Sequence, residues 1–478
     1  MMRSFQVITL VITQLLIQSA YAALPAPVLA ALKAENVPID SVSIYVQQVD
    51  KAEPRLMYNA DIARNPASVI KLMTSYAALD VLGPAYRWKT NFYAIEAIEN
   101  GMLQGGLWVK ASGDPSLNTG NIAEIASAIH QRYGLQKICC GLMVDNSVFA
   151  PVAFDTNVFD SEPYRSYNAP AEALMLNQQA VRFQFILPEN PQKNNRVLTV
   201  AYPNWPGLNV QSDIKVSGAD CNEWKSQLIF KRVADQFFIS GNYPAACNDK
   251  YIDLHWMSGS EYFSSFFYSA WQSAGGSWIE KNSKPISPKM RFAPLPESAT
   301  LLYQHTSPPL ADVLRDMNKT SNNVIARAVY LALSETDNQP ASVTRSEQVL
   351  RGWLASKQLN FNELVLENGS GLSRKERISA AHLGQLLISA YQSPIMPELT
   401  ASLPILGVDG TLERRKDNSA SGRAHLKSGS LDNVRAVAGY VLDNQSRRWV
   451  IVFIANGLKA ANTKSAQQAL LDWVVAQP

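Results

Sequence analysis

The segment Asn65–Thr74 reads NPASVIKLMT and places a serine, Ser68, three residues before a lysine, Lys71, on an otherwise apolar stretch. Lysine often lays its methylene stem along apolar surface and lifts its ammonium group into water. A second interpretation is that Lys71 takes the proton of Ser68, because a serine hydroxyl is a weak nucleophile until a base activates it. Since Ser-x-x-Lys occurs by chance in many long chains, the rest of the sequence must decide.

The same segment has the signals of a helix of about 15 residues. Pro66 suits the first helical position, apolar residues recur at helical spacing after it, and Gly83 with Pro84 ends the pattern. A serine and a lysine three residues apart lie ~60° apart around a helix axis, on one face. Ser68 would fall in the first turn, beside free backbone N–H groups that carry partial positive charge.

A second motif is the pair Ser321 and Asn323, a Ser-x-Asn pattern at the start of the apolar run VIARAVYLAL. The structural interpretation is that Ser321 or Asn322 caps the helix that follows. The functional interpretation is that both side chains face a cleft. The two interpretations are compatible, because a residue in a cap loop can still present its side chain to a site.

A third motif is Lys427, Ser428 and Gly429, in the stretch HLKSGSL, near the start of a predicted strand. Alternation puts Lys427 and Gly429 on one side of the strand and Ser428 on the other. A glycine lets a substrate backbone approach and pair with the strand, and the lysine supplies a cation for a terminal carboxylate. The alternative is an ordinary edge strand guarded by a lysine.

The chain has 478 residues, which suggests about three domains. Alternating β-branched segments at both ends, with helical patterns from about residue 308 between them, predict one α/β domain split in sequence. We assign residues 23–89 and 284–478 to that domain. Residues 90–283 hold short alternating segments between turn residues and predict a mostly β insert of one or two domains.

The first 22 residues, MMRSFQVITLVITQLLIQSAYA, have the features of a secretory signal peptide cleaved after Ala22. The alternative is a membrane anchor, but the apolar core is shorter than the ~20 residues that a span needs and is broken by Thr13 and Gln14. We therefore expect an exported protein in the periplasm, with at most peripheral membrane association. The net charge of +3 argues against nucleic acid as the main partner.

Export changes how the four cysteines are interpreted. In an oxidising compartment Cys221 and Cys247 are expected to pair. For the adjacent Cys139 and Cys140, a vicinal disulfide and two buried thiols both remain open. No cysteine and histidine cluster has zinc spacing, so we expect no metal site, and no cofactor motif is present.

The order Ser-x-x-Lys, Ser-x-Asn, Lys-Ser/Thr-Gly is the motif set of β-lactamases and penicillin-binding proteins. The chain resembles the low-molecular-mass class C penicillin-binding proteins, the D-alanyl-D-alanine carboxypeptidase/endopeptidase family. Supporting segments are SPPLADVLRDMNKTSNN, DSEPYRSYNAPAEAL, ENGSGLSR and KSGSL. The resemblance implies a transpeptidase-like domain, an antiparallel sheet with helices on both faces, interrupted by mostly β inserted domains. These are expected as two nested units, about 90–180 with 262–283, and about 181–261.

The resemblance also implies roles for the motif residues. Ser68 would be the acylated nucleophile and Lys71 its general base. Ser321 would relay a proton to the leaving amine, and Asn323 would hold the substrate amide. Lys427 would act electrostatically on the serine and on the substrate carboxylate.

The third motif is implied to bind substrate. Ser428 stands where the family more often has threonine and would hydrogen-bond the substrate carboxylate, beside Gly429. The backbone N–H groups of Ser68 and Ser430 would form the oxyanion hole.

At the periphery of the site, Asp160 would meet the free amine of the diamino acid of the peptide, with Glu162 as the competing carboxylate. Tyr167 would form an apolar wall or belong to the core, and Arg374 would line the site or lie on the surface. Asp432 departs from the polar amide expected two residues after Ser430.

The expected function is a serine D-Ala-D-Ala carboxypeptidase, with DD-endopeptidase activity as well, acting on peptidoglycan stem peptides and acylated by β-lactams. The first alternative is a serine β-lactamase, although its deacylating glutamate loop has no clear counterpart and the insert is large. An alternative of another class is a non-turnover β-lactam receptor or a cell-wall binding protein. The oligomeric state is not predicted.

Overall fold

The two ends of the chain form one five-stranded antiparallel sheet, in the order β18-β19-β20-β1-β2. The computed structural model describes residues 23–151, 156–280, 290–336 and 339–478, so the expected signal peptide lies outside the described residues. The strands of this sheet are β1 (Val42–Gln48), β2 (Leu56–Tyr58), β18 (Ala424–Leu431), β19 (Val434–Leu442) and β20 (Arg448–Asn456).

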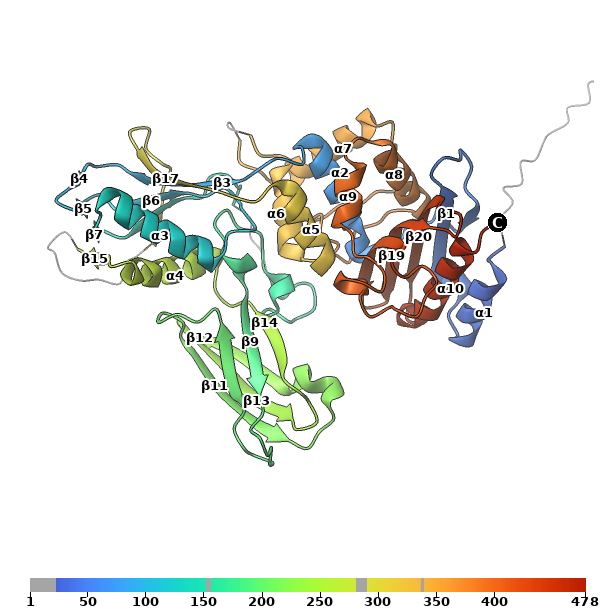
Figure 1. The fold of residues 1–478 in the computed structure, drawn as a ribbon, viewed down its shortest axis with the longest axis horizontal. Coiled ribbons are helices and arrows are strands. Elements are labelled where there is room, and N and C mark those ends of the chain that lie inside the picture. The colour runs from blue at the N-terminus through green and yellow to red at the C-terminus, as the bar shows by residue number, and fades with distance from the viewer. Residues whose placement is uncertain (1–22, 152–155, 281–289, 337–338) are drawn as a thin grey trace, which may run out of the picture.

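Helices cover both faces of this sheet, at the right of Figure 1. Alternate residues of each strand enter two different cores: on β19, Val437 and Val441 pack with one set of helices, and Ala438 and Tyr440 with the other. Burial on both faces explains why these strands are continuously apolar. One face is covered by α1 (Ala26–Ala34) and α10 (Lys464–Val475). The other is covered by α2 (Lys71–Val81), α5 (Leu310–Thr320), α6 (Asn323–Ala332), α7 (Val343–Ser356), α8 (Ala380–Gln392) and α9 (Met396–Ser402).

A second lobe, at the left of Figure 1, holds two sheets and two helices. The sheet order is β16-β8-β6-β3-β17 in one and β15-β7-β5-β4 in the other. Its elements are β3 (Lys89–Ala94), β4 (Ile98–Glu99), β5 (Met102–Leu103), β6 (Leu107–Lys110), α3 (Thr119–Tyr133), β7 (Lys137–Cys139), β8 (Leu142–Asp145), α4 (Gly259–Ser273), β15 (Ser277–Ile279), β16 (Met290–Phe292) and β17 (Thr300–Thr306).

This lobe differs from the sequence expectation in two ways. The expected boundary at residue 283 is too early, because β16 pairs with β8 and β17 pairs with β3, so the lobe extends to Thr306. The expectation of a mostly β insert also omitted α3 and α4, each of 15 residues with a capping box at its N-terminus. Strong strand patterns on either side hid their helical spacing. The division into nested domains remains our proposal, with its outer boundary moved to follow β17.

A third lobe, at the bottom of Figure 1, consists of two three-stranded sheets in the orders β10-β9-β14 and β11-β13-β12. Aromatic side chains fill its core; for example, the ring centroids of Phe185 and Tyr243 are 5.5 Å apart. The strands are β9 (Val181–Ile186), β10 (Leu198–Tyr202), β11 (Val210–Ser217), β12 (Leu228–Val233), β13 (Gln236–Pro244) and β14 (Lys250–Leu254).

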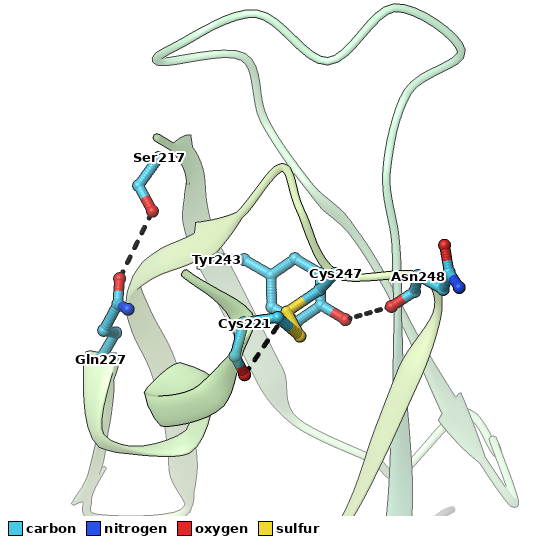
Figure 2. The surroundings of a disulfide bond; sticks show 6 residues. All are labelled: Ser217, Cys221, Gln227, Tyr243, Cys247 and Asn248. Carbon is cyan, nitrogen blue, oxygen red and sulfur yellow. Dashed lines mark hydrogen bonds between the residues drawn. A yellow bond between two sulfur atoms is a disulfide. The ribbon is translucent and has the colours of Figure 1, made fainter. Parts of the chain in front are cut away.

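Two disulfides are present. Figure 2 shows the bond between Cys221 and Cys247, which ties the segment before β12 to the turn after β13, beside the hydrogen bond from the Tyr243 hydroxyl to the Asn248 carbonyl. The pairing expected from the sequence is therefore present. Cys139 and Cys140, left open by the sequence, are also joined to each other.

Two features are absent from the residues that the structure describes. No helix there is both long enough and apolar enough to cross a membrane. In the same ranges, no group of three or more His, Cys, Asp or Glu side chains is arranged to hold a metal ion.

Candidate active site

Ser68 lies in a tight 3-10 turn, Ala67–Ile70, that precedes α2. The sequence predicted a single helix from Pro66, but the α-helix begins only at Lys71. Ala67 has a positive φ of 47°, which an L-residue adopts only when its surroundings hold it. Asn65 supplies that hold: its Oδ1 accepts the Ala67 N–H at 2.9 Å, and its Nδ2 donates to the Ser373 carbonyl at 2.8 Å. The turn leaves the Ser68 side chain partly exposed.

Lys71 is completely buried and its amine contacts three oxygens. The Nζ atom lies 3.1 Å from Ser68 Oγ and 2.7 Å from Asn323 Oδ1, and it also donates to the carbonyl of Ser370. A carbonyl oxygen can only accept a hydrogen bond, whereas a hydroxyl can also donate one. The Ser68 hydroxyl is therefore the one partner of these three that can donate to the lone pair of a neutral amine.

The surroundings of Lys71 favour that neutral form. Burial lowers the pKa of Lys71 well below its usual range, and the positive charges of Lys427 and Arg327 lower it further. The carboxylate of Glu376 acts in the opposite direction. Because its pKa is lowered, Lys71 loses its proton at a lower pH than a solvated lysine does, which suits it to act as a proton acceptor.

Ser321 and Asn323 come from the junction of α5 and α6. Ser321 ends α5 in the left-handed conformation, with φ 58°. Asn322 caps α6, since its side chain accepts the N–H of Ile325 at 3.0 Å, so Asn322 rather than Ser321 is the cap. Because Asn322 is the cap, the Ser321 hydroxyl is available to accept a hydrogen bond from Lys427 Nζ at 2.7 Å. Asn323, the first residue of α6, reaches Lys71.

Lys427 enters the site from β18 and is completely buried. Burial lowers its pKa to about 7. Two residues further along the strand, Gly429 lies against the Ser68 turn: a Cβ there would be 2.7 Å from the Pro66 carbonyl oxygen and 3.1 Å from the Ser68 nitrogen. The third motif is thus pressed directly against the first, and glycine is the residue that permits the approach.

These side chains meet at one cleft of about 610 Å³. Ser68, Ser321 and Asn323 line it from the helical side, and Ser430 lines it from the end of β18. The structure therefore brings together three motifs that are distant in the sequence: Ser68 with Lys71, Ser321 with Asn323, and Lys427 with Gly429.

Comparison with known proteins shows which protein family the chain belongs to. A model of the D-Ala-D-Ala carboxypeptidase 3 (S13) family matches residues 25–477. The chain belongs to this family. The S13 chain is 25% identical to the D-alanyl-D-alanine carboxypeptidase DacB of Haemophilus influenzae, over 85% of this chain and 84% of that protein. It is 26% identical to the D-alanyl-D-alanine carboxypeptidase of Actinomadura sp., over 82% of this chain and 74% of that protein.

A solved structure shares the fold. The crystal structure of penicillin binding protein 4 from Haemophilus influenzae matches with a TM-score of 0.78 at 22% identity, over 94% of this chain and 99% of that chain. A second structure of the same protein, complexed with a β-lactam, matches with a TM-score of 0.76. The S13 chain therefore has the penicillin-binding fold with its inserted lobes, and it is a D-Ala-D-Ala carboxypeptidase.

Of the residues predicted at the edge of the site, some line the cleft and others pair with neighbours instead. Asp160 and Tyr167 line the cleft, and the Tyr167 hydroxyl donates to Asp160 Oδ2 at 2.8 Å. Tyr167 is 39% exposed, so it is a wall of the cleft and does not belong to the core. Glu162, the competing carboxylate, instead pairs with Arg165 at 3.2 Å.

Other predicted residues lie just outside the described lining of the cleft. Arg374 is not part of that lining. It donates to the carboxylate of Asp432 at 2.9 Å, and Asp432 is part of the lining. Its guanidinium also stacks 4.4 Å from the ring centroid of Phe159. The hydroxyl of Ser428 is 2.9 Å from that of Thr411 and is likewise absent from the lining.

The loop Glu367–Glu376, which includes the segment ENGSGLSR, supports Lys71 in a way that the sequence does not predict. The Ser370 carbonyl holds the Lys71 amine, and a backbone group has no signature in the side-chain sequence. The available signal was the pair Gly369 and Gly371, both with positive φ, at 69° and 82°.

The glycine at 371 gives a first prediction. A Cβ at this position would overlap the carbonyl of Ala67, immediately before Ser68. We expect Gly371→Ala to destabilise the protein by about 3 kcal/mol and to slow acylation by about 100-fold, because the Ser68 turn must move. Unfolding midpoints and rates of penicillin labelling measure the two effects.

Gly422→Ala is the matched control, because Gly422 has a similar φ of 74° with nothing within 4 Å of the added Cβ. It should cost about 1 kcal/mol of backbone strain and leave the acylation rate unchanged. Equal effects from the two variants would contradict the close-approach argument.

Proposed function

We propose that Ser68 is the nucleophile of this carboxypeptidase and Lys71 its general base. The Ser68 hydroxyl gives its proton to the neutral Lys71 amine as Oγ attacks the carbonyl of the penultimate D-alanine. The observation that carries this assignment is the buried Lys71 amine, whose hydroxyl partner is Ser68 and whose other two partners accept only. The oxyanion would be received by the backbone N–H groups of Ser68 and Ser430.

The second half of acylation expels D-alanine. The tetrahedral intermediate collapses, the peptide C–N bond breaks, and the leaving amine takes a proton from Ser321. Lys427 supports this role, since its amine donates to Ser321 and can return the proton. Water then attacks the ester on Ser68 and gives a proton to the Lys427 amine, while Lys71 returns to Ser68 Oγ the proton that it took; the shortened peptide leaves, and the hydroxyl and both amines are restored. Asn323 accepts from Lys71 at its Oδ1, and its Nδ2 donates one N–H to the Tyr167 carbonyl at 3.4 Å, which leaves the second N–H for the substrate amide.

The proposed substrates are peptidoglycan stem peptides ending in D-Ala-D-Ala, together with the D-Ala–diamino-acid bonds of cross-links. β-Lactams would acylate the same serine, an inference supported by the β-lactam complex of the similarly folded Haemophilus protein. The open cleft of about 610 Å³ is large enough for a peptide branch.

The proposed location is the periplasm, after removal of the signal peptide at Ala22. The cleavage site lies outside the described residues. Two disulfides support export, because such bonds persist in oxidising compartments.

One experiment tests the proposed function against its alternatives. The mature protein is incubated with a labelled penicillin and, separately, with a D-Ala-D-Ala peptide. A long-lived adduct mapped to Ser68, together with D-alanine release, supports the peptidase. Rapid penicillin turnover without peptide cleavage would instead identify a β-lactamase, and an adduct without peptide turnover would identify a receptor.

A second prediction concerns substrate choice. Asp160 lines the cleft, and its carboxylate is a suitable partner for the free amine of a diamino acid. We expect Asp160→Ala to lower kcat/KM about tenfold for a peptide with a free side-chain amine, and to have little effect when that amine is acetylated.

The control is Glu162→Ala, which removes a nearby carboxylate that pairs with Arg165. This variant should treat both peptides as the wild type does. If Glu162→Ala carries the amine-dependent loss and Asp160→Ala does not, the assignment of the carboxylate is wrong.

A further inference from the structure

Glu376 is a completely buried carboxyl group close to the catalytic lysine, and the mechanism above does not use it. Its Oε1 accepts the N–H groups of Glu367 and Asn368, both at 3.2 Å. Its Oε2 is buried and has no hydrogen-bond partner among the described residues. Burying a carboxyl group with one oxygen unsatisfied costs free energy, and an apolar residue would avoid that cost.

A continuous chain of hydrogen bonds leads from Glu376 to Lys71. Asn368, whose N–H is held by Glu376, accepts at Oδ1 from the Ser370 N–H at 2.9 Å and from the Ser370 hydroxyl at 2.6 Å. The Asn368 amide also donates to the Leu372 carbonyl at 3.0 Å. This closed turn presents the Ser370 carbonyl to the Lys71 amine.

The Glu367–Leu372 turn also packs closely against α2 and Tyr330, so a shift of the turn would move residues of the site. The Thr74 hydroxyl of α2 donates to the Gly369 carbonyl at 2.7 Å. A Cβ on Gly369 would lie 2.6 Å from the ring of Tyr330. Whatever sets the shape of this turn therefore sets the position of the Ser370 carbonyl, and with it the position of the Lys71 amine.

The charges around the turn are unbalanced without Glu376. Lys71 is faced by Lys427 from β18 and by Arg327 from α6, each nine-tenths buried or more. Glu376 is the group that raises the pKa of Lys71 against burial and these two cations. Burial raises the pKa of Glu376 above its usual value, against the N–H groups of Asn368 and Glu367 and the charge of Lys71, which lower it. A carboxylate at this position is a counter-charge for Arg327, and for Lys71 once that amine has taken the Ser68 proton.

We propose that Glu376 is a positioning residue for acylation: it holds the Glu367–Leu372 turn so that the Ser370 carbonyl keeps the Lys71 amine on Ser68, and its charge balances the buried cations. The inference rests on the proposed function, because it acts through Lys71 on Ser68. No bond is made or broken at Glu376.

Two substitutions separate the effect of Glu376 on the shape of the turn from the effect of its charge. Glu376→Gln keeps an oxygen that can accept both backbone N–H groups but removes the charge. Glu376→Leu removes the charge and the acceptor. Each variant is labelled with penicillin across the acid and neutral pH range, and both the rate constant per labelled site and the final adduct per chain are recorded.

We expect Glu376→Leu to slow acylation about 100-fold, because the Lys71 amine is no longer fixed, while the final adduct stays near one per chain. Glu376→Gln should retain the rate to within about tenfold. Its acid limb should move to lower pH: without the carboxylate the Lys71 cation is less stabilised, so the neutral amine persists further into acid.

The matched control is Glu363→Gln, a half-buried carboxylate of the same region that accepts the Ser379 N–H at 2.9 Å and contacts His382. It should leave the acid limb in place. The proposal is overturned if Glu376→Leu acylates at the wild-type rate, if Glu376→Gln leaves the acid limb unmoved, or if the adduct per chain falls while the rate constant holds, since that last result is a loss of folded protein. Absence of a wild-type adduct on Ser68 is a different outcome and would overturn the proposed function instead.

Discussion

Replacing Ser68 by alanine is expected to abolish both D-alanine release and covalent penicillin labelling, by about five to six orders of magnitude in rate. The reason is chemical: Oγ is the atom that forms the ester, and no other hydroxyl contacts the Lys71 amine among the bonds that the structure describes. The fold should survive, because the side chain makes one hydrogen bond, worth about 1 kcal/mol. Mass spectrometry of the labelled chain and a D-alanine assay measure the two losses.

Ser75→Ala, on the helix α2 that follows the Ser68 turn, is the matched control. Ser75 is completely buried and its hydroxyl accepts from Asn318 Nδ2 at 2.9 Å, away from the cleft. Its replacement should lower stability by about 1 kcal/mol and leave both activities intact. A Ser68→Ala protein that still forms the penicillin adduct would refute the assignment of the nucleophile.

Replacing Lys71 by methionine is expected to slow acylation by about three to four orders of magnitude, since a positioned base is lost. The variant should nevertheless be more stable than the wild type. Burial lowers the folded-state pKa of Lys71 well below that of the unfolded chain, so the unfolded state binds more protons. Wild-type stability therefore falls as pH decreases from the unfolded pKa toward the folded pKa, and methionine removes that dependence. Thermal unfolding at several pH values tests the sign.

The control for Lys71→Met is Lys357→Met, which removes a lysine paired with Asp80 of α2 at 2.8 Å, on the outer side of the same helix. Acylation should be unchanged there. An unfolded Lys71→Met protein would favour a packing role for the lysine, and acylation within tenfold of wild type would exclude Lys71 as the base.

The placement of residues within each motif could be predicted from the sequence because the three motifs are local. Ser68 with Lys71, Ser321 with Asn323, and Lys427 with Gly429 each sit within one turn or strand end, so their spacing predicts their relative placement. Their convergence was inferred from resemblance, since residues separated by several hundred positions leave no pattern in one sequence.

Other features depended on contacts that a sequence does not display. The 3-10 turn at Ala67 is held by Asn65, whose partners are Ser373 and Asn456. The pairing of Glu162 with Arg165, which supports our proposal of Asp160 as the partner of the substrate amine, is another such contact. The lobe boundary failed for a similar reason, because β17 pairs with β3 across nearly the whole insert.

The position of β1 in the main sheet has a consequence for biogenesis. β1 lies between β2 and β20, so Val42 is paired with Ala455 and the central strand pair joins opposite ends of the chain. During synthesis, which proceeds from the N-terminus, the inserted lobes can fold while Ser68 and Lys71 lie on a segment whose partner strands have not yet been made. Lys427 and the last strands arrive late, and such distant pairing is slow. The cleft where Ser68, Lys71 and Lys427 meet can therefore form only when nearly all of the chain has been made.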